Sequence, residues 1–108
     1  MAKEKKSSGK KVHFTIVKRN DGWIVVPGIG LASVGDTAVW KPIGAKLLEI
    51  DLPDTFSPQQ LNSNGTEVEA QIVSGLGYYD YTILATDTQK KGKLKKAKGA
   101  SSPGIIID

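Results

Sequence analysis

Residues 66–73, with the sequence TEVEAQIV, show the clearest alternation of apolar and polar side chains in the chain. In an extended strand Val68, Ala70 and Ile72 point to one side, and the residues between them point to the other. A strand with one apolar and one polar face is typical of an antiparallel sheet that covers a core on one side. The segment therefore predicts an all-β fold in which Glu67 and Glu69 face solvent.

Six further segments have the same two-residue period or a short β-branched run, and turn residues such as Gly, Pro and Asn separate them. They are residues 12–18, 23–26, 37–41, 46–52, 78–86 and 104–107. About seven strands at roughly regular spacing predict a β-sandwich or a barrel.

Two stretches between these segments need another interpretation. Residues 53–65 are compatible with a helical turn, because Ser57 can cap a helix and Pro58 suits the first helical position before Leu61. The glycines at 28, 30 and 35 are spaced like a phosphate-binding loop, but a strand follows them in place of a helix. We therefore interpret them as turn glycines.

Length and charge divide the chain into three parts. Its 108 residues suit one domain with a single apolar core, and the absence of cysteine excludes disulfides and zinc–thiolate sites. Residues 1–11 hold five lysines and one glutamate, residues 90–98 hold six lysines, and the rest of the chain has four basic residues against ten acidic ones. We predict a flexible basic arm over residues 1–11, a single sandwich domain over 12–108, and a lysine-rich loop over 87–102.

The chain shows no targeting or membrane segment. Residues 1–11 lack the apolar stretch of about 7 to 15 residues that a secretory signal needs. No segment approaches the roughly 18 apolar residues of a membrane-spanning helix. The chain as written is therefore expected to be cytoplasmic, unless a leader has been removed.

The order of these signals resembles the cupredoxin family, the Greek-key β-sandwiches of the plastocyanin and azurin type. The likeness covers most of the chain after residue 12. The motifs that carry it are Val26-Pro27, then Gly35-Asp36-Thr37-Ala38-Val39-Trp40, then Tyr79-Asp80-Tyr81-Thr82-Ile83, and the closing strand 104–107. The resemblance implies an all-β Greek-key sandwich of about seven strands.

The resemblance also implies where copper would be bound, and the ligand residues are missing from those positions. Family members use a histidine soon after the aromatic strand, and then a cysteine, a histidine and usually a methionine around the last loop. Here residues 45–48 stand at the first histidine position, and Ile83 or Leu84 stands at the cysteine position. Lysines occupy the last loop. We therefore expect a copper-free fold with no metal and no cofactor.

His13 is the only histidine, which limits the chemistry available. It alternates with Val12 and Phe14, so we expect it on the solvent side of its strand. No nucleophile motif accompanies it, which argues against a Ser-His-Asp triad.

The carboxylates offer no better catalytic or metal site. Glu67 and Glu69 would lie about 7 Å apart on one strand face, but alternating acids on a solvent face are common without catalysis. Asp51 and Asp54 lack the dense oxygen-ligand spacing of a calcium site. The chain is therefore predicted not to be an enzyme.

The aromatic residues divide between core and surface. Tyr79 and Tyr81 alternate onto one face with Ile83, and we expect both rings, like that of Trp40, to pack in the core. Trp23 and Tyr78 sit beside turns, where a ring need not be buried. We interpret Trp23 and Tyr78 as candidate interaction aromatics.

Two functions from different classes remain. The first is a non-enzymatic, copper-free, cupredoxin-like module for protein interaction or a structural role, with homo-oligomerisation through an exposed strand edge left open. The second is sequence-independent binding of a polyanion, either nucleic acid or an anionic membrane, by the lysine arm and loop. Without interleaved aromatics or arginines, base-specific recognition is not expected. The residues assigned to polyanion binding are Lys10, Lys11, Lys90, Lys91, Lys93, Lys95, Lys96 and Lys98.

Overall fold

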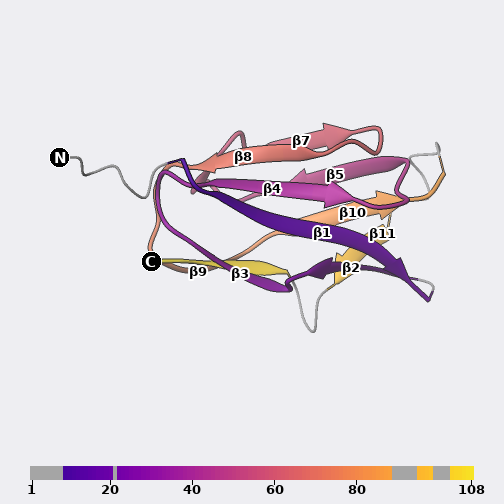
Figure 1. The fold of residues 1–108 in the computed structure, drawn as a ribbon, viewed down its shortest axis with the longest axis horizontal. Coiled ribbons are helices and arrows are strands. Elements are labelled where there is room, and N and C mark those ends of the chain that lie inside the picture. Colours follow the sequence, from indigo (N-terminus) through magenta and orange to yellow (C-terminus); the bar gives the residue numbers. More distant parts are fainter. Residues whose placement is uncertain (1–8, 21, 89–94, 99–102) are drawn as a thin grey trace.

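The computed structural model describes residues 9–20, 22–88, 95–98 and 103–108 (Figure 1). These residues form strands and turns without a helix, which confirms the all-β class. Among them there is accordingly no helix that could span a lipid bilayer. The strands are β1 (Lys11–Arg19), β2 (Gly22–Val26), β3 (Ile29–Ala32), β4 (Thr37–Pro42), β5 (Leu47–Asp51), β6 (Phe56–Ser57), β7 (Gln60–Ser63), β8 (Val68–Ile72), β9 (Gly77–Asp80), β10 (Thr82–Thr86), β11 (Lys95–Lys98) and β12 (Gly104–Ile107).

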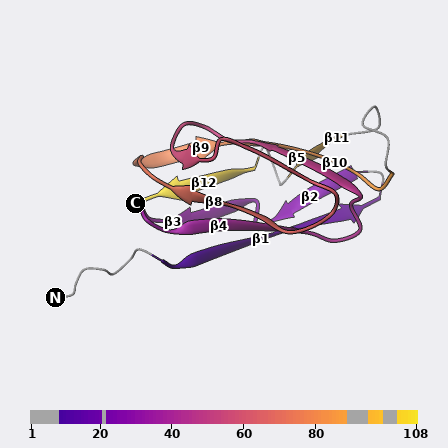
Figure 2. The same cartoon turned by 90° about the horizontal axis from the view of Figure 1, so that it is seen from above.

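The strands form a nine-stranded sheet in the order β6-β8-β4-β1-β2-β11-β10-β5-β7 and a three-stranded sheet in the order β3-β12-β9. The larger sheet curls around the core, so that its last strand, β7, lies against β8. Seen from above, β5 and β10 form one layer and β1 and β4 form the other (Figure 2). The described part of the chain is therefore a two-layered β-structure with more strands than the seven expected.

Two stretches of chain cross from one sheet to the other. β2 pairs with β1 in the large sheet, and after Pro27 and Gly28 the chain continues as β3, which pairs with β12 in the small sheet. Proline has no N–H to donate, so the ladder stops there. Residues 78–86, expected as one strand, are likewise divided at Tyr81, whose N–H bonds Pro103 O at 3.1 Å.

The helical turn expected around Ser57 is absent. Phe56–Ser57 pairs with β8, and Gln60–Ser63 pairs with β5. Pro58 separates these two short strands, and the Leu52 N–H bonds Gln59 O at 2.8 Å. Leu61 is buried at its position opposite Ile50, so burial of an apolar side chain in the sheet outweighs the helix-start signal.

The lysine-rich segment is not a loop throughout. Lys95–Lys98 forms β11, which runs parallel to β2 and antiparallel to β10. This strand closes the gap between two strands that would otherwise be edges. Backbone hydrogen bonding, which does not depend on side-chain hydrophobicity, explains how a lysine-rich segment can form a strand here.

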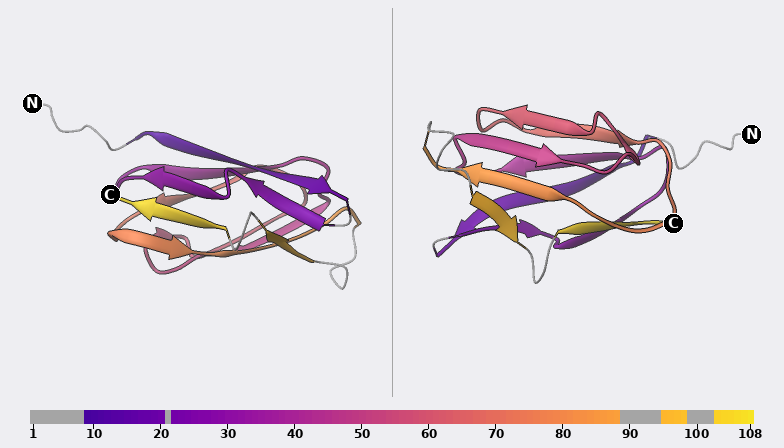
Figure 3. Two further views of the ribbon diagram at one scale, coloured as in Figure 1. Left: turned by 90° about the horizontal axis from the view of Figure 1, so that it is seen from below. Right: turned by 180° about the vertical axis from the view of Figure 1, so that it is seen from behind.

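Figure 3 shows the layers of strands from two further sides, and the core between them centres on four aromatic rings. Phe14 stacks on Trp40 with ring centroids 5.4 Å apart, and Tyr81 meets Trp40 edge-on at 5.5 Å. Trp40 Nε1 donates a hydrogen bond to Tyr81 Oη at 3.1 Å, and the Phe56 ring lies tilted to that of Trp40 with ring centroids 6.2 Å apart. The core positions expected for Trp40 and Tyr81 are confirmed, and Tyr79 is half-buried against the same core.

The three glycines interpreted as turn residues differ in role. Gly35 has φ of +99° in the turn before β4, as expected, and Gly28 lies in the bend before β3. Gly30 lies inside β3, where a Cβ atom would come within 2.4 Å of Phe14 Cζ. It is therefore a packing glycine, and this close approach corrects the turn assignment.

The turn at Gly35 is closed by a buried carboxylate. Asp36 is 2% exposed, and its Oδ2 accepts a hydrogen bond from the Ser33 N–H at 3.0 Å. Its own N–H returns a bond to Ser33 O, also at 3.0 Å. These two bonds hold the chain as it enters β4.

Candidate functional site

The described parts of the two basic segments do not come together. Lys11 pairs with Thr37 at the start of β1, whereas β11 lies beside Ile24, which pairs with Val17 six residues further along β1. Six residues of strand span about 20 Å. Figure 1 shows the start of β1 and β11 towards opposite ends of the fold. Lys90, Lys91 and Lys93 lie outside the described residues.

Two basic side chains on β1 already have acidic neighbours. Lys11 Nζ is 3.8 Å from Glu69, and Lys18 Nζ is 2.7 Å from Asp87. Both pairs are solvent-exposed, and such pairs contribute about 0.2–1 kcal/mol each. These ion pairs are therefore weak, and the backbone pairing of β1 sets the positions of Lys11 and Lys18.

Trp23 is not a surface aromatic. Its side chain is only 4% exposed, because Trp23 alternates with Val25 onto the inward face of β2 and both side chains belong to the buried core cluster. The prediction from its position beside a turn was therefore wrong, because strand alternation directs the ring inward from the second residue of β2. Trp23 therefore belongs to the core and not to an interaction surface.

Tyr78, the other candidate aromatic, is exposed on a sheet face that is mostly apolar. In the small sheet Leu31 pairs with Ile106, and Ile106 pairs with Tyr78, so these three side chains form one row across three strands. Residues in direct register point to the same side of a sheet. Ile29 lies beside this row, and the exposed fractions of the four side chains are 40–63%.

The rest of this surface follows from strand alternation. Ile105 and Ile107 point inward and are fully buried, so Ile106 between them must point outward. Two residues before Ile106 on β12, Gly104 also lies on the outward face, opposite Asp80 of β9. Two residues after Ile106 and Leu31, Asp108 and Ser33 lie on the same face. We call this surface the small-sheet face, and it comprises Ile29, Leu31, Ser33, Tyr78, Asp80, Gly104, Ile106 and Asp108.

Gly104 allows Tyr78 to lie down on the sheet. A Cβ atom on Gly104 would be 2.4 Å from Tyr78 Oη and 2.6 Å from Cζ, so the ring occupies the space above the glycine. One side of the ring is against the backbone, and about half of the side chain, 51%, remains exposed. The result is a flat aromatic surface next to Ile106.

The charges on the small-sheet face are all negative. β3, β9 and β12 contain a single charged residue, Asp80. Asp108 follows β12, and its Oδ1 accepts a hydrogen bond from Ser33 Oγ at 2.6 Å. The apolar row therefore lies between two carboxylates.

The sequence interpretation missed Ile29, Leu31 and Ile106 as surface residues. A signal was available at the end of the chain, because three consecutive isoleucines in a strand cannot all face one core. No comparable signal existed for β3, which was assigned to a turn.

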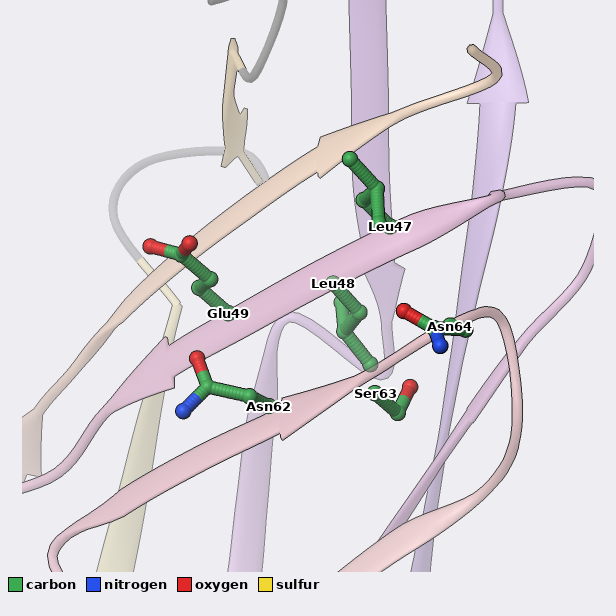
Figure 4. Close-up of a pocket in the computed structure, with 6 residues that line it drawn as sticks. All are labelled: Leu47, Leu48, Glu49, Asn62, Ser63 and Asn64. Atoms are coloured by element: carbon green, nitrogen blue, oxygen red, sulfur yellow. The ribbon is translucent and has the colours of Figure 1, made fainter. Parts of the chain in front are cut away.

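A shallow depression lies on another surface, between β5 and β7 (Figure 4). It has a volume of about 240 Å³ and is lined by Leu47, Leu48, Glu49, Asn62, Ser63 and Asn64. Glu49 and Asn62 are opposite each other in register, and Ser63 Oγ donates to Thr66 O at 2.8 Å. Ligand-binding pockets are usually about 300–1,000 Å³ and largely enclosed, so this open depression is not a convincing small-molecule site.

The residues considered for catalysis or metal binding are exposed on the surface. His13 is exposed on β1, and Glu67 and Glu69 are exposed near β8, as expected. Asp51 and Asp54 are exposed as well. Within the described ranges, no three histidine, aspartate or glutamate side chains gather in a group that could hold a metal ion.

Buried apolar side chains lie in the segments where the cupredoxin resemblance implies the first histidine and the cysteine. Ala45, Leu48 and Ile83 are buried, and Leu48 pairs with Ala85 on β10. Comparison with protein-family models and with curated protein sequences found no match for this chain.

Proposed function

We propose that this chain is a non-enzymatic, copper-free module of the cupredoxin type that binds a partner protein through the small-sheet face. The observation that carries the proposal is the exposed apolar row Leu31, Ile106 and Tyr78, aligned in register on three strands. Contiguous exposed apolar patches on proteins often mark interaction sites.

The strand pairing supports the Greek-key part of the proposal. β1 runs parallel to β4, and β3 runs parallel to β12. Parallel neighbours cannot be joined by a tight hairpin, so the chain must pass over the ends of the sheets to connect them. Crossing connections of this kind are a feature of Greek-key sandwiches and not of a simple meander.

The packing at the expected ligand positions supports a copper-free state. Copper binding there would require polar ligand side chains, and Leu48 and Ile83 are instead part of the apolar core. Burying each such side chain contributes about 1.5–3 kcal/mol to folding. These positions therefore serve stability.

The size of the apolar row sets the expected strength of binding. The three half-exposed side chains of the row and Ile29 beside them would gain roughly 1 kcal/mol each on full burial, or about 4 kcal/mol together. Association costs about 4–15 kcal/mol in lost translational and rotational freedom. The row alone is therefore insufficient for tight binding, and we expect a transient complex that needs further contacts.

Photo-crosslinking in the source cells tests the proposal. A photoreactive side chain placed at position 31 should capture a discrete partner protein, whereas the same group at position 43 should not. Ile43 is a matched control, because it is 53% exposed and follows β4 outside the small-sheet face. Equal capture from both positions, or capture of no protein from position 31, would contradict the proposal.

A copper titration tests the copper-free part separately. We expect Cu(II) to bind only weakly, through the exposed imidazole of His13, and His13→Ala to remove that binding. Competition with a chelator of known affinity measures it. Stoichiometric, tight binding that persists in His13→Ala would require another ligand set and would contradict this assignment.

The polyanion alternative receives less support from the geometry. Lys10 and Lys11 are at the start of β1, and β11 lies about 20 Å further along the sheet, so they do not form one described basic surface. Sequence-independent binding by neutralised phosphates should weaken steeply with salt. A salt-insensitive complex would argue against it.

A further inference from the structure

We infer that the partner of the small-sheet face is an amphipathic helix whose apolar stripe is bordered by lysine or arginine side chains. The inference rests on the proposed function, because it specifies the occupant of the same surface. Three features of the face carry it: the arrangement of apolar and acidic positions, the size of the sheet, and the absence of basic residues from its strands.

The apolar and acidic positions form three rows across the sheet. The middle row is Leu31, Ile106 and Tyr78, and the row on one side ends in Asp80. The row on the other side contains Asp108, which is held by Ser33 Oγ. A ligand that covers the middle row therefore meets a carboxylate on each side.

These carboxylates favour a partner with cationic borders. β3, β9 and β12 contain no lysine or arginine, so no basic side chain of these strands neutralises Asp80 or Asp108. Lysine and arginine can cover apolar surface with their aliphatic stems and place the charged group at the edge. The complementary ligand is therefore apolar in the centre and basic at both borders.

The dimensions of the face suit one helix. Three strands about 4.8 Å apart give a width of roughly 10 Å between the outer strands, and four residues of β12 extend for roughly 10–13 Å. An α-helix with its side chains is about 10–12 Å wide and rises about 5.4 Å per turn. Two to three helical turns would cover the face, with apolar residues at i, i+3, i+4 and i+7.

The carboxylates of Asp80 and Asp108 disfavour two alternative occupants, a second copy of this chain and an anionic membrane. A second copy of this chain would bring Asp80 and Asp108 against an equally acidic surface. A membrane with anionic lipids would repel the same carboxylates. Both alternatives are included as outcomes of the experiment.

The experiment uses three synthetic 14-residue helical peptides and the purified full chain. The first peptide has leucines at i, i+3, i+4 and i+7 with lysines at both borders, the second has glutamates in place of those lysines, and the third has glutamines in place of the leucines. Methyl NMR follows binding at Ile29, Leu31 and Ile106. We expect the first peptide to bind at micromolar to millimolar concentration, the second about fivefold more weakly because two exposed ion pairs are lost, and the third not to shift these methyl groups.

Variants assign the effects to the face. Leu31→Gln should lower the affinity for the first peptide at least fivefold. Ile106→Thr provides the same test if Leu31→Gln does not fold. Ile43→Gln, the exposed control outside the face, should leave the affinity unchanged. In the double variant Asp80→Asn, Asp108→Asn, the lysine and glutamate peptides should bind with nearly equal affinity.

Several results would overturn the inference. They are equal binding of the lysine and glutamate peptides, no effect of either apolar variant, a dimer in sedimentation at the NMR concentration that Leu31→Gln dissociates, or binding to phosphatidylcholine–phosphatidylglycerol vesicles. A crosslinked partner from position 31 together with equal affinity for the lysine and glutamate peptides would retain the proposed function and reject only the helix chemistry. If position 31 captures no partner and none of the three peptides shifts the methyl groups of the face, the proposed function itself is rejected.

Discussion

At the scale of single residues, Tyr81 couples the core to pH. Burial raises the pKa of its phenol from 10.0 to about 12, because the phenolate would lose its hydration in the core. The hydrogen bond from Trp40 Nε1 opposes this shift in part, and the nearby phenol of Tyr78 adds to it. The folded chain therefore keeps this proton at pH values where the unfolded chain releases it.

Stability should fall as the pH rises from about 10 to about 12. Below pH 10 the Tyr81 phenol is neutral in both the folded and the unfolded chain, so its ionisation does not lower the free energy of unfolding. Above it the unfolded state ionises first, and the free energy of unfolding decreases by about 1.4 kcal/mol per pH unit, or roughly 3 kcal/mol in all. Urea unfolding at several alkaline pH values, compared between wild type and Tyr81→Phe, isolates this group from the lysines. Parallel pH profiles for the two proteins would contradict the assignment.

Gly30→Ala should destabilise the fold through the Phe14 ring. The new Cβ would lie 2.4 Å from Phe14 Cζ, and overpacking in a core costs about 1–3 kcal/mol. Gly22→Ala is the control, because no atom lies within 4 Å of its added Cβ. Thermal or urea unfolding should show a loss only for Gly30→Ala. Equal stabilities would show that Phe14 moves without cost.

At the scale of elements, β11 is held by its backbone. Lys96 pairs with Leu84, and Ala97 pairs with Trp23, so the strand supplies hydrogen bonds to both neighbours. Without it, β2 and β10 would have unpaired edges. The strand is therefore part of the fold and not an appendage.

Ala97→Pro should weaken this part of the sheet. Proline removes the backbone donor and cannot occupy a central strand without distortion, so we expect a loss of about 1–3 kcal/mol. Hydrogen exchange should become faster in β2 and β10 around Ile24 and Leu84. Ala97→Val, which keeps the N–H and favours strands, should retain protection, and similar exchange in both variants would count against a structural β11.

Elements with a regular side-chain pattern could be predicted from the sequence, and those determined by distant contacts could not. Residues 66–73 gave β8 because their alternation reflects one buried face. β3 was missed because Gly30 resembles a turn residue. The Phe14 ring requires a glycine at this position of the strand, and Phe14 is distant in sequence. β11 was missed because its strand pairing uses backbone groups that no side-chain pattern reveals.

The small-sheet face, too, could be predicted from the sequence only in part. Tyr78 was identified from its place beside a turn, but the same argument placed Trp23 wrongly, because Trp23 faces the core together with Val25 although it lies next to a turn. Leu31 became visible as a surface residue only when β3 was paired with β12. A surface formed by three strands from separate parts of the chain needs the sheet topology, which a single sequence does not provide.

At the scale of the whole molecule, the two sheets share one core. Phe14 and Trp40 come from the large sheet, Ile105 and Ile107 come from the small sheet, and Tyr81 lies where the chain passes between them. Because β2–β3 and β9–β10 each run through both sheets, neither sheet has a separate stretch of sequence. The two sheets should therefore unfold together.

Urea unfolding should accordingly be two-state, as is usual for single domains of this size. Tryptophan fluorescence reports on the large sheet, and the amides of β12 report on the small sheet by NMR. We expect both signals to give the same midpoint. Earlier loss of the β12 signals would indicate that the small sheet unfolds separately.

The contact between Tyr78 and Gly104 has a consequence for sequence variation. Any side chain at position 104 would displace the ring, and without the ring the glycine would leave an unfilled hollow. Positions 78 and 104 should therefore covary across related chains: an aromatic residue with glycine, or a smaller residue with a β-branched one. A chain of the second type would present a flat aliphatic surface and would select a different set of partners.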